Sequence, residues 1–332
     1  MEYKVCVITV TYGNRWEFLE AVLKRILTFD NVSHVVLVNN ACQYSINTAI
    51  GNLADKRIHL INENENRGSA GGYKIGIEYA SQLDSNFLWL LDDDNLPDNN
   101  CLDSLLRKWT SISGVENRKA LFCLREDRKQ HIKIAQGENP YRFYLVPNNF
   151  LGFSIFRIFV NQFKKLGDWY KRPRILKDVQ IPFAPYGGLL LHKSILSDIG
   201  VPDEQYYLYV DDTEYTYRIT EKLGTIWLIP SCRIVDIDKS HGIGYKNKIL
   251  RSPLLDNWSF RTYYHVRNMI FFNKKAIKNI YFFKINKRLY LAGLFLISIW
   301  SGKKLEYKYL MEAINDGLKG NLGKKEFNNG RN

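Results

Sequence analysis

The chain has 332 residues, 45% of them hydrophobic, and five scattered cysteines with no Cys-x-x-Cys spacing. This composition indicates a folded globular protein and excludes an intrinsically disordered chain, a disulfide framework and a zinc knuckle. The formal net charge is +13, but residues 1–100 hold 8 basic and 13 acidic side chains, whereas residues 241–332 hold 18 and 5. The basic excess therefore belongs mainly to the C-terminal quarter.

Apolar strands and amphipathic helices alternate over the first hundred residues. We expect strands at 4–12, 34–41, 57–63 and 86–91, and helices at 14–29 and 72–83. This alternation predicts an α/β fold with an open, mostly parallel central sheet. In such sheets ligands bind beyond the carboxyl ends of the strands.

The remainder of the chain is less regular. Residues 121–179 are aromatic and basic with mixed periodicity, and we interpret them as an insertion or flap. A short strand at 189–192, a helix ended by Gly200, a helix at 210–224 and strand-like runs at 225–230 and 233–238 follow, and helices prevail from residue 252. We therefore expect one α/β domain over 1–250 and a basic, helical region over 251–332.

Three consecutive carboxylates, Asp92, Asp93 and Asp94, directly follow the apolar run "FLWLL". Mutual repulsion opposes this crowding, so the three carboxylates either bind a positive group or leave one of them with a raised pKa. A divalent cation is the simpler explanation, because carboxylates spaced as Asp-x-Asp suit a hard ion such as Mg²⁺ or Mn²⁺. A solvated turn is the alternative, because "DNLPDNN" is rich in turn formers. The preceding buried strand favours the metal site, because it fixes the carboxylates at the ligand-binding edge of the sheet.

Two further stretches contain candidate functional residues. "NENRGSAGGYKIGIEYA" places small residues ahead of a helix, which is either an anion-binding loop or an ordinary glycine-rich helix start. In "YLYVDDTEYTYRI", Asp211 to Glu214 has the spacing of a helix-capping pair, and Glu214 to Arg218 that of an ion pair. This pattern assigns no structural role to Asp212 in the first turn, and Asp212 is a candidate general base.

His241, in "DIDKSHGIGY", lies on a predicted loop. A histidine in such a place is usually solvated or hydrogen-bonded. Neutral imidazole is also a good third ligand for Mn²⁺ beside two carboxylates, so both interpretations stay open.

Taken in order, "VTYGNR", "LVNN", "NENRGSAGG", "LLDDDN", "FAPYGGLLLH", "VDDTEYTYR" and "SHGIG" resemble the family 2 glycosyltransferases of the GT-A fold. The match covers roughly residues 4–245 and is similar to the bacterial rhamnosyl- and galactofuranosyltransferase branch. "YYHVRNMIFF" resembles a Tyr-x-x-Arg-Asn segment that often follows that domain. At Lys74 many relatives have asparagine instead.

The resemblance implies a role for each matching residue. It implies Asp212 as the catalytic base, and Asp92, Asp94 and His241 as ligands of Mn²⁺ or Mg²⁺. The donor would contact Thr11, Tyr12, Arg15, Asn39, Asn66, Gly68 and Asp93, and the acceptor Tyr186, Gly187, Gly188 and Asp211. The reaction implied is a single displacement that inverts the sugar, with galactofuranose from UDP-galactofuranose as the first choice and rhamnose from dTDP-rhamnose as the alternative.

Two other classes of protein share single features with this chain. A haloacid-type phosphatase also has an apolar strand ending in Asp-x-Asp, but its motif lies near the N-terminus and Leu96 occupies the place where it has Thr or Val. A basic nucleic-acid-binding protein would explain the charged tail, but no recognition motif supports it and we expect no nucleic acid partner. The sequence does not indicate the oligomeric state.

The basic tail contains the run "LYLAGLFLISIW", Leu289 to Trp300, which is flanked by Lys and Arg. Twelve residues are too few to span a bilayer as a helix, which takes about 20. We predict peripheral contact with an anionic membrane surface, where a lipid-linked glycan acceptor would be found, and a buried core helix with a wet edge is the alternative. The cysteine pattern and the absence of an evident signal peptide predict a cytoplasmic protein at the inner face of the bacterial plasma membrane.

Overall fold

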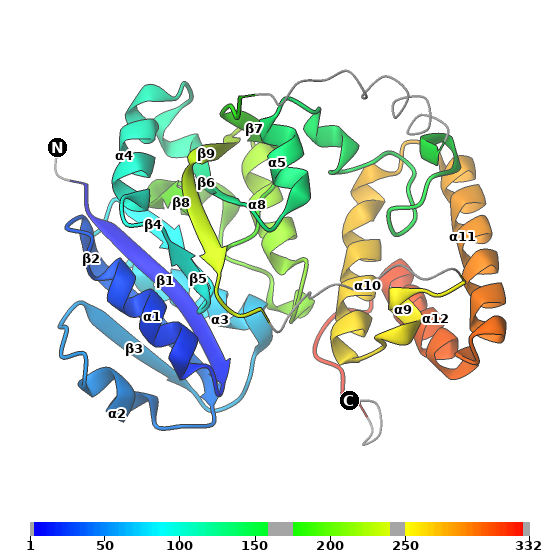
Figure 1. Ribbon diagram of the computed structural model, residues 1–332, viewed down its shortest axis with the longest axis horizontal. Coiled ribbons are helices and arrows are strands. Elements are labelled where there is room, and N and C mark those ends of the chain that lie inside the picture. The colour runs from blue at the N-terminus through cyan, green and yellow to red at the C-terminus, as the bar shows by residue number, and fades with distance from the viewer. Residues whose placement is uncertain (1–2, 159–174, 240–249, 328–332) are drawn as a thin grey trace. The chain divides into compact units, whose positions relative to one another are not determined.

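The computed structural model describes residues 3–158, 175–239 and 250–327 (Figure 1). Within these ranges the chain divides into two compact units. The first comprises 3–140, 175–204 and 211–239, and the second comprises 141–158, 205–210 and 250–327.

The first unit is built on a nine-stranded sheet in the order β3-β2-β1-β4-β8-β6-β9-β5, with β7 paired to β9. Its strands are β1 (Val5–Gly13), β2 (Val32–Cys42), β3 (Ile58–Glu63), β4 (Phe87–Leu90), β5 (Asn95–Pro97), β6 (Lys119–Arg125), β7 (Val179–Ile181), β8 (Leu189–His192) and β9 (Thr225–Asp236). Strands β3, β2, β1 and β4 are mutually parallel, and β8 joins β4 to β6 in antiparallel pairing. The predicted α/β class with a mostly parallel central sheet is confirmed.

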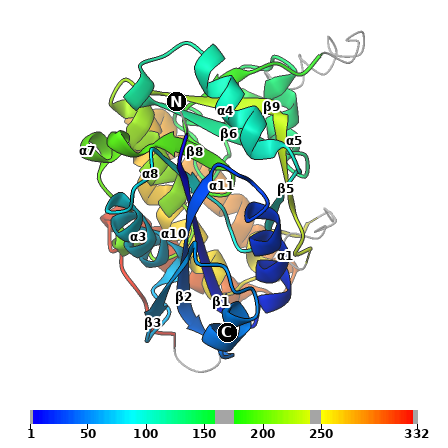
Figure 2. The ribbon, with the colours of Figure 1, turned by 90° about the vertical axis from the view of Figure 1, so that its left-hand side faces the viewer.

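Helices cover both faces of this sheet (Figures 1 and 2). The helices of the first unit are α1 (Trp16–Ile26), α2 (Ile46–Gly51), α3 (Gly68–Ser81), α4 (Cys101–Ser111), α5 (Lys129–Ala135), α7 (Leu196–Ile199) and α8 (Asp211–Glu221). Buried side chains of α1 and α4 form one core with the sheet. On the other face α3 packs close to β1. The distance is so short that a Cβ added at Gly72 would lie 2.5 Å from the Val10 side chain. Small residues in α3 therefore fit it tightly against the sheet.

The predicted insertion or flap over 121–179 falls in several parts of the structure. Residues 121–125 belong to β6, which lies inside the sheet between β8 and β9, and α5 follows it. Residues 141–158 are part of the second unit, and 159–174 lie outside the described residues. The strand-like runs at 225–230 and 233–238 are joined in one strand, β9, whose register shifts around Pro230.

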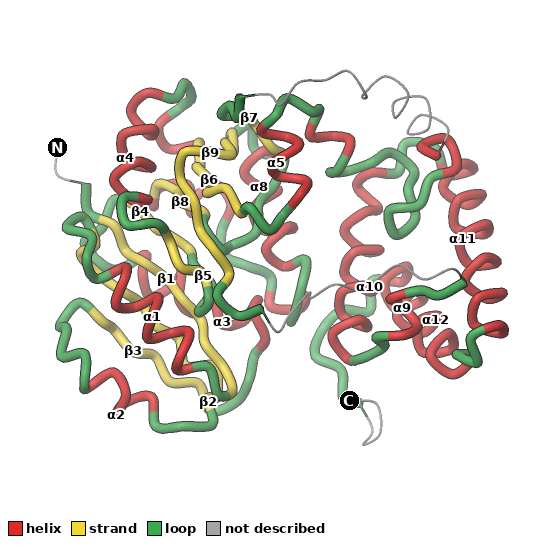
Figure 3. The backbone as a smooth tube through the Cα atoms, viewed as in Figure 1, coloured by secondary structure: helices red, strands yellow, loops and turns green. Residues whose placement is uncertain are grey.

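The second unit is helical, as Figure 3 shows. It includes the helices α9 (Pro253–Asp256), α10 (Phe260–Asn273), α11 (Ile280–Trp300) and α12 (Lys304–Lys319). Their inward side chains form a second core, which includes Tyr263, Phe283, Leu294 and Leu310. No helix in the described ranges is long and apolar enough to cross a membrane.

Candidate active site

The three consecutive aspartates lie where β4 ends, as predicted, but they face different surroundings. Asp93 is only 4% exposed. Its Oδ2 accepts a hydrogen bond of 2.7 Å from the Thr11 hydroxyl of β1, and both of its oxygens lie within 3.0 Å of Arg15 Nε. Burial raises the pKa of Asp93 to about 6, against the opposing charge of Arg15. The resemblance places Asp93 at the donor, and in the structure its carboxylate is turned toward Thr11 and Arg15.

Arg15 forms ion pairs with three carboxylates. Besides Asp93, its guanidinium donates to Asp94 Oδ2 at 2.8 Å and to Asp238 Oδ2, beyond the end of β9, at 2.5 Å. It also lies 5.5 Å from the centre of the Tyr12 ring. Burial and the charges of the neighbouring aspartates raise the pKa of Asp94 to about 7. One guanidinium thus faces an excess of negative charge, which a further cation would relieve.

Asn95 is a site residue that sequence reasoning missed. Its side chain is fully buried, accepts a hydrogen bond from the Asp92 amide at 3.2 Å, and donates to Asp94 Oδ1 at 3.1 Å and to Asp236 Oδ1 at 2.8 Å. It therefore fixes the turn between β4 and β5. The only sequence signal is its place directly after the third aspartate.

Gly187 allows its segment to approach this turn closely. A Cβ there would lie 1.9 Å from Asn95 Oδ1 and 2.7 Å from Asp92 Oδ2. The neighbouring Gly188 has φ 103°, which side-chain-bearing residues rarely adopt. The Gly-Gly pair, predicted at the acceptor, is thus required by the packing beside the aspartates.

Asp92 is the most accessible of the three carboxylates, with 41% of its side chain exposed. Its Oδ1 lies 2.9 Å from the Tyr73 hydroxyl of α3, and its Oδ2 lies 3.9 Å from a guanidinium nitrogen of Arg125 in β6. Arg125 also forms an ion pair with Asp236. The centre of the Tyr73 ring lies 4.1 Å from that of Tyr186, a predicted acceptor residue, with the two rings tilted by 35°. Asp92 is therefore the aspartate best placed to meet a ligand.

Helix α8 supplies two more carboxylates. Asp211 is the first residue of α8, not the capping residue before it, and its Oδ1 accepts from Ser69 Oγ at 2.9 Å. The capping interpretation is therefore wrong. The Oδ2 atom of Asp211 is buried and has no hydrogen-bond partner. Burial is the largest cause that raises the pKa of Asp211 well above its usual range, and the charge of Asp212 is the second. The predicted Glu214–Arg218 ion pair is present at 2.6 Å.

Asp212 is partly exposed and accepts a hydrogen bond of 2.6 Å from the Thr213 amide. Burial and the charge of Asp92 raise its pKa to about 6, whereas the Thr213 amide and the charge of Arg125 oppose the rise. Asp92 and Asp212 therefore act on each other electrostatically although 120 positions separate them. A carboxylate with this pKa is mostly ionised at neutral pH and still basic enough to accept a proton.

The predicted donor loop is held by asparagines. Asn40, at the end of β2, accepts from the Arg67 amide at 2.8 Å and donates to the Gly68 carbonyl at 2.9 Å, and Asn66 Oδ1 accepts from the Gly68 amide at 2.8 Å. Asn39 lies beside Thr11 in the parallel register of β1 and β2. These residues share one edge of the sheet with the aspartates.

His241 lies outside the described residues, so its predicted role as a metal ligand stays a prediction. Among the residues that are described, no three His, Cys, Asp or Glu side chains are grouped so that they could hold a metal ion.

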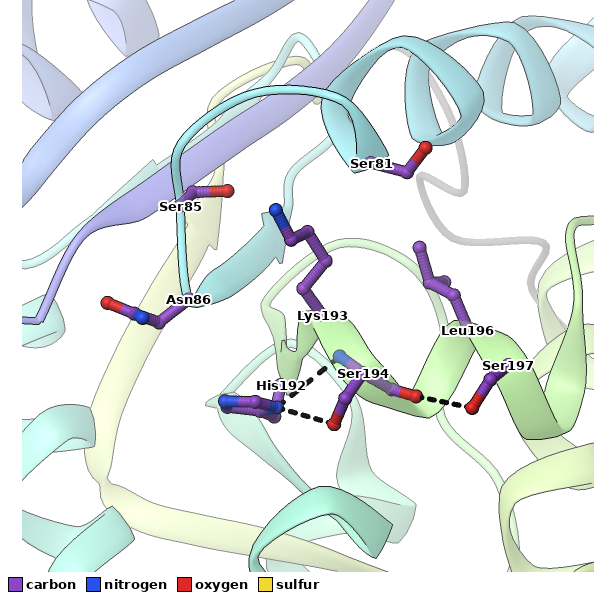
Figure 4. Close-up of a pocket in the computed structure, with 8 residues that line it drawn as sticks. All are labelled: Ser81, Ser85, Asn86, His192, Lys193, Ser194, Leu196 and Ser197. Carbon is purple, nitrogen blue, oxygen red and sulfur yellow. Dashed lines mark hydrogen bonds between the residues drawn. The ribbon is translucent and has the colours of Figure 1, made fainter.

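A separate surface pocket lies at the opposite end of β4 from the aspartates (Figure 4). Its lining includes Asn86, which precedes β4, and His192 and Lys193, at the end of β8. The His192 ring lies 2.7 Å from Ser194 Oγ, and Lys193 donates to the Leu83 carbonyl. None of the predicted site residues lines this pocket.

Comparison with known proteins gives a family match and two relatives. The family model of Glycosyl transferase family 2 matches residues 6–200. The dTDP-rhamnosyl transferase RfbF of Shigella flexneri is 24% identical over 99% of this chain and 100% of its own length. The galactofuranosyltransferase GlfT1 of Mycolicibacterium smegmatis is 30% identical over 37% of this chain and 40% of its own length.

Among solved structures, a similar fold is found in the mannosyltransferase PcManGT from Pyrobaculum calidifontis, in complex with GDP-Man and Mn²⁺. The TM-score is 0.55 at 17% identity, and the match covers 96% of this chain and 88% of that chain. At this identity the likeness concerns the fold.

Proposed function

The chain belongs to Glycosyl transferase family 2, and on that basis we propose that it transfers a hexose from a nucleotide-sugar to a hydroxyl of a glycan acceptor, with inversion. Membership in this family favours glycosyl transfer over the phosphatase and nucleic-acid-binding alternatives. The observation that carries the proposal is that α3 contacts the carboxylates at the end of β4 and at the start of α8. Its Tyr73 hydroxyl lies 2.9 Å from Asp92 Oδ1, and its Ser69 hydroxyl donates at 2.9 Å to Asp211, the neighbour of Asp212.

In the proposed reaction Asp212 accepts the proton of the acceptor hydroxyl. The hydroxyl oxygen forms a bond to the anomeric carbon while the bond from that carbon to the diphosphate oxygen breaks, with the nucleoside diphosphate leaving on the opposite face. A single displacement of this kind inverts the anomeric configuration. The raised pKa of Asp212 suits the task, because a base works best when its pKa is near the working pH.

The donor side of the site has the chemistry of a divalent cation site. Asp92 and Asp94 supply the hard oxygen ligands that Mg²⁺ and Mn²⁺ prefer, and His241 is the proposed third ligand. The excess of carboxylates around Arg15 supports this assignment. A bound ion would neutralise charge that develops on the departing diphosphate. Thr11, Asn39 and the loop at Gly68 are the proposed neighbours of the nucleotide.

Two donors are candidates. The sequence motifs put galactofuranose from UDP-galactofuranose first. The similarity to RfbF over the full length of both chains favours rhamnose from dTDP-rhamnose, whereas the match to GlfT1 is partial. A donor screen that measures released UDP or dTDP, with Mn²⁺ and a lipid-linked glycan acceptor, decides between them. Release with neither donor would contradict the proposal.

We also propose that α11 places the enzyme at an anionic membrane surface. One face of α11 packs into the helical core through residues such as Leu294, whereas Leu296 is 66% exposed and Trp300 76% exposed. The helix contains Lys284, two further basic residues and no acidic residue. An apolar face with cationic flanks suits the boundary between anionic headgroups and acyl chains. An enzyme held at this surface would meet a lipid-linked acceptor at the inner face of the plasma membrane.

Co-sedimentation with vesicles tests the membrane proposal. We expect binding to vesicles that contain phosphatidylglycerol, weaker binding to phosphatidylcholine alone, and loss of binding in Leu296→Asp. The variant Leu322→Asp, outside α11, is the control for added charge. The membrane proposal would be refuted if both variants bound equally to vesicles that contain phosphatidylglycerol, or if the unaltered chain did not bind to them.

A further inference from the structure

The segment 205–210, directly before α8, has a strained backbone. Tyr207, Tyr209 and Val210 have φ values of 61°, 63° and 65°. This left-handed region is rare for residues other than glycine, and for a β-branched residue such as Val210 it is a true outlier. Such residues persist only where the surrounding structure holds them. The segment must therefore be held in place by other groups.

Asn268 of α10 provides the main restraint. Its side chain is fully buried, and its Nδ2 lies 2.8 Å from the Tyr206 carbonyl oxygen, 2.9 Å from that of Leu208 and 2.8 Å from that of Tyr209. Two amide hydrogens are thus shared among three carbonyls of the strained segment. Only asparagine and glutamine have a side-chain amide, which offers two N–H donors and a carbonyl acceptor, and glutamine is one methylene longer.

Arg267 completes the restraint. It is 1% exposed, donates from Nε to Asn268 Oδ1 at 2.8 Å, and so orients the asparagine amide with its donors toward the segment. Its other nitrogens donate to the Tyr206 carbonyl at 3.2 Å and to the Gly323 carbonyl at 2.6 Å. The Tyr264 ring lies 4.8 Å from the Arg267 guanidinium and 4.9 Å from the Tyr207 ring. The Tyr-x-x-Arg-Asn motif, Tyr264 to Asn268, is thus built around this segment.

We propose that Arg267 and Asn268 are positioning residues for the transfer reaction, because they hold the strained segment that leads into the two α8 carboxylates. The segment ends at Val210, one residue before Asp211 and two before Asp212. The inference rests on the proposed role of Asp212 as the base. A small displacement of a base relative to the acceptor is enough to reduce the rate about a hundredfold.

The test compares two buried asparagines of the helical unit in the 332-residue chain. Asn268→Ala should lower kcat at least tenfold while Mn²⁺-dependent binding of UDP or dTDP stays within about threefold. The matched control is Asn286→Ala. Asn286 is also buried and holds a different loop, through the Asn148 carbonyl at 2.8 Å and the Ile155 amide at 3.1 Å. This control should lose thermal stability but retain kcat per folded molecule.

A glycine rescue separates positioning from general stability. Glycine adopts positive φ without strain, so Val210→Gly reduces the need for the restraint. The double variant Asn268→Ala/Val210→Gly should recover most of the lost kcat, although Val210→Gly alone removes a buried side chain. The inference is overturned by any of three results. These are that Asn268→Ala keeps the kcat of the unaltered chain, that Asn286→Ala loses as much kcat as Asn268→Ala, or that the double variant with Val210→Gly recovers none of the lost kcat. An active Asp212→Asn variant would instead refute the proposed base.

Discussion

Asp212→Asn is expected to separate activity from stability. The substitution keeps the size of the side chain and an oxygen that can accept from the Thr213 amide, but it removes the proton acceptor. General base catalysis contributes about 10²- to 10⁴-fold, so kcat should fall by that factor, or about 3 to 5 kcal/mol in activation free energy. Donor binding should persist, because Asp212 is not a proposed metal ligand.

The same substitution should stabilise the fold at neutral pH. The pKa of Asp212 is raised from the usual 3.8 to about 6, mainly by burial, so the folded chain holds the proton more tightly than the unfolded chain. Stability is therefore lost as pH rises from about 4 to about 6, and above this window the ionised carboxylate destabilises the fold by up to about 3 kcal/mol. Asparagine has no such penalty.

Two measurements check this prediction. One is kcat against pH for the unaltered enzyme, which should fall about tenfold per pH unit below about 6, because the base becomes protonated. The other is the thermal midpoint of Asp212→Asn, which should rise at pH 7. Glu214→Gln is the control on the same helix, because it breaks only the ion pair with Arg218. An Asp212→Asn enzyme with more than a tenth of normal kcat, or with a lower thermal midpoint, would refute the reasoning.

Three further predictions concern the aspartate cluster. Asp94→Asn should weaken Mn²⁺-dependent UDP or dTDP binding at least tenfold, measured by calorimetry, and unchanged affinity would exclude Asp94 as a ligand. Gly187→Ala should impair donor binding and turnover together, because the new methyl would overlap Asn95 and press on Asp92; a fully active variant would contradict this. Arg15→Gln should lower unfolding free energy by about 3 to 5 kcal/mol in denaturant titration, because three carboxylates lose their shared cation. An unchanged unfolding midpoint would show that they need no counter-ion.

Local patterns predicted the parts of the fold and site that depend on neighbouring residues. Runs of apolar residues predicted β1, β2 and β4, and the aspartates after β4 were expected at its carboxyl edge because strand direction fixes that edge. The pattern at 225–238 predicted two strands, because Pro230 interrupts it. The structure keeps one strand and accommodates the proline with a shift in register.

Contacts between distant residues could not be predicted in this way. Arg15 and Asp238 are 223 positions apart, and no local pattern indicates that they meet. The roles of Asn95 and Asn268 likewise follow from the groups around their amides, because the same side chain suits an exposed turn. Strain at Val210 is invisible in the sequence, since valine is typical of strands.

The second unit is assembled from three separate stretches of the chain, and one of them, 205–210, lies within the sequence of the transferase domain. Exchange of the tail between related enzymes at residue 250 would therefore separate Arg267 and Asn268 from the backbone that they hold. Chimeras made to change membrane targeting should exchange 205–210 together with the tail. The same linkage predicts that recombination in this family preserves the two stretches as a pair.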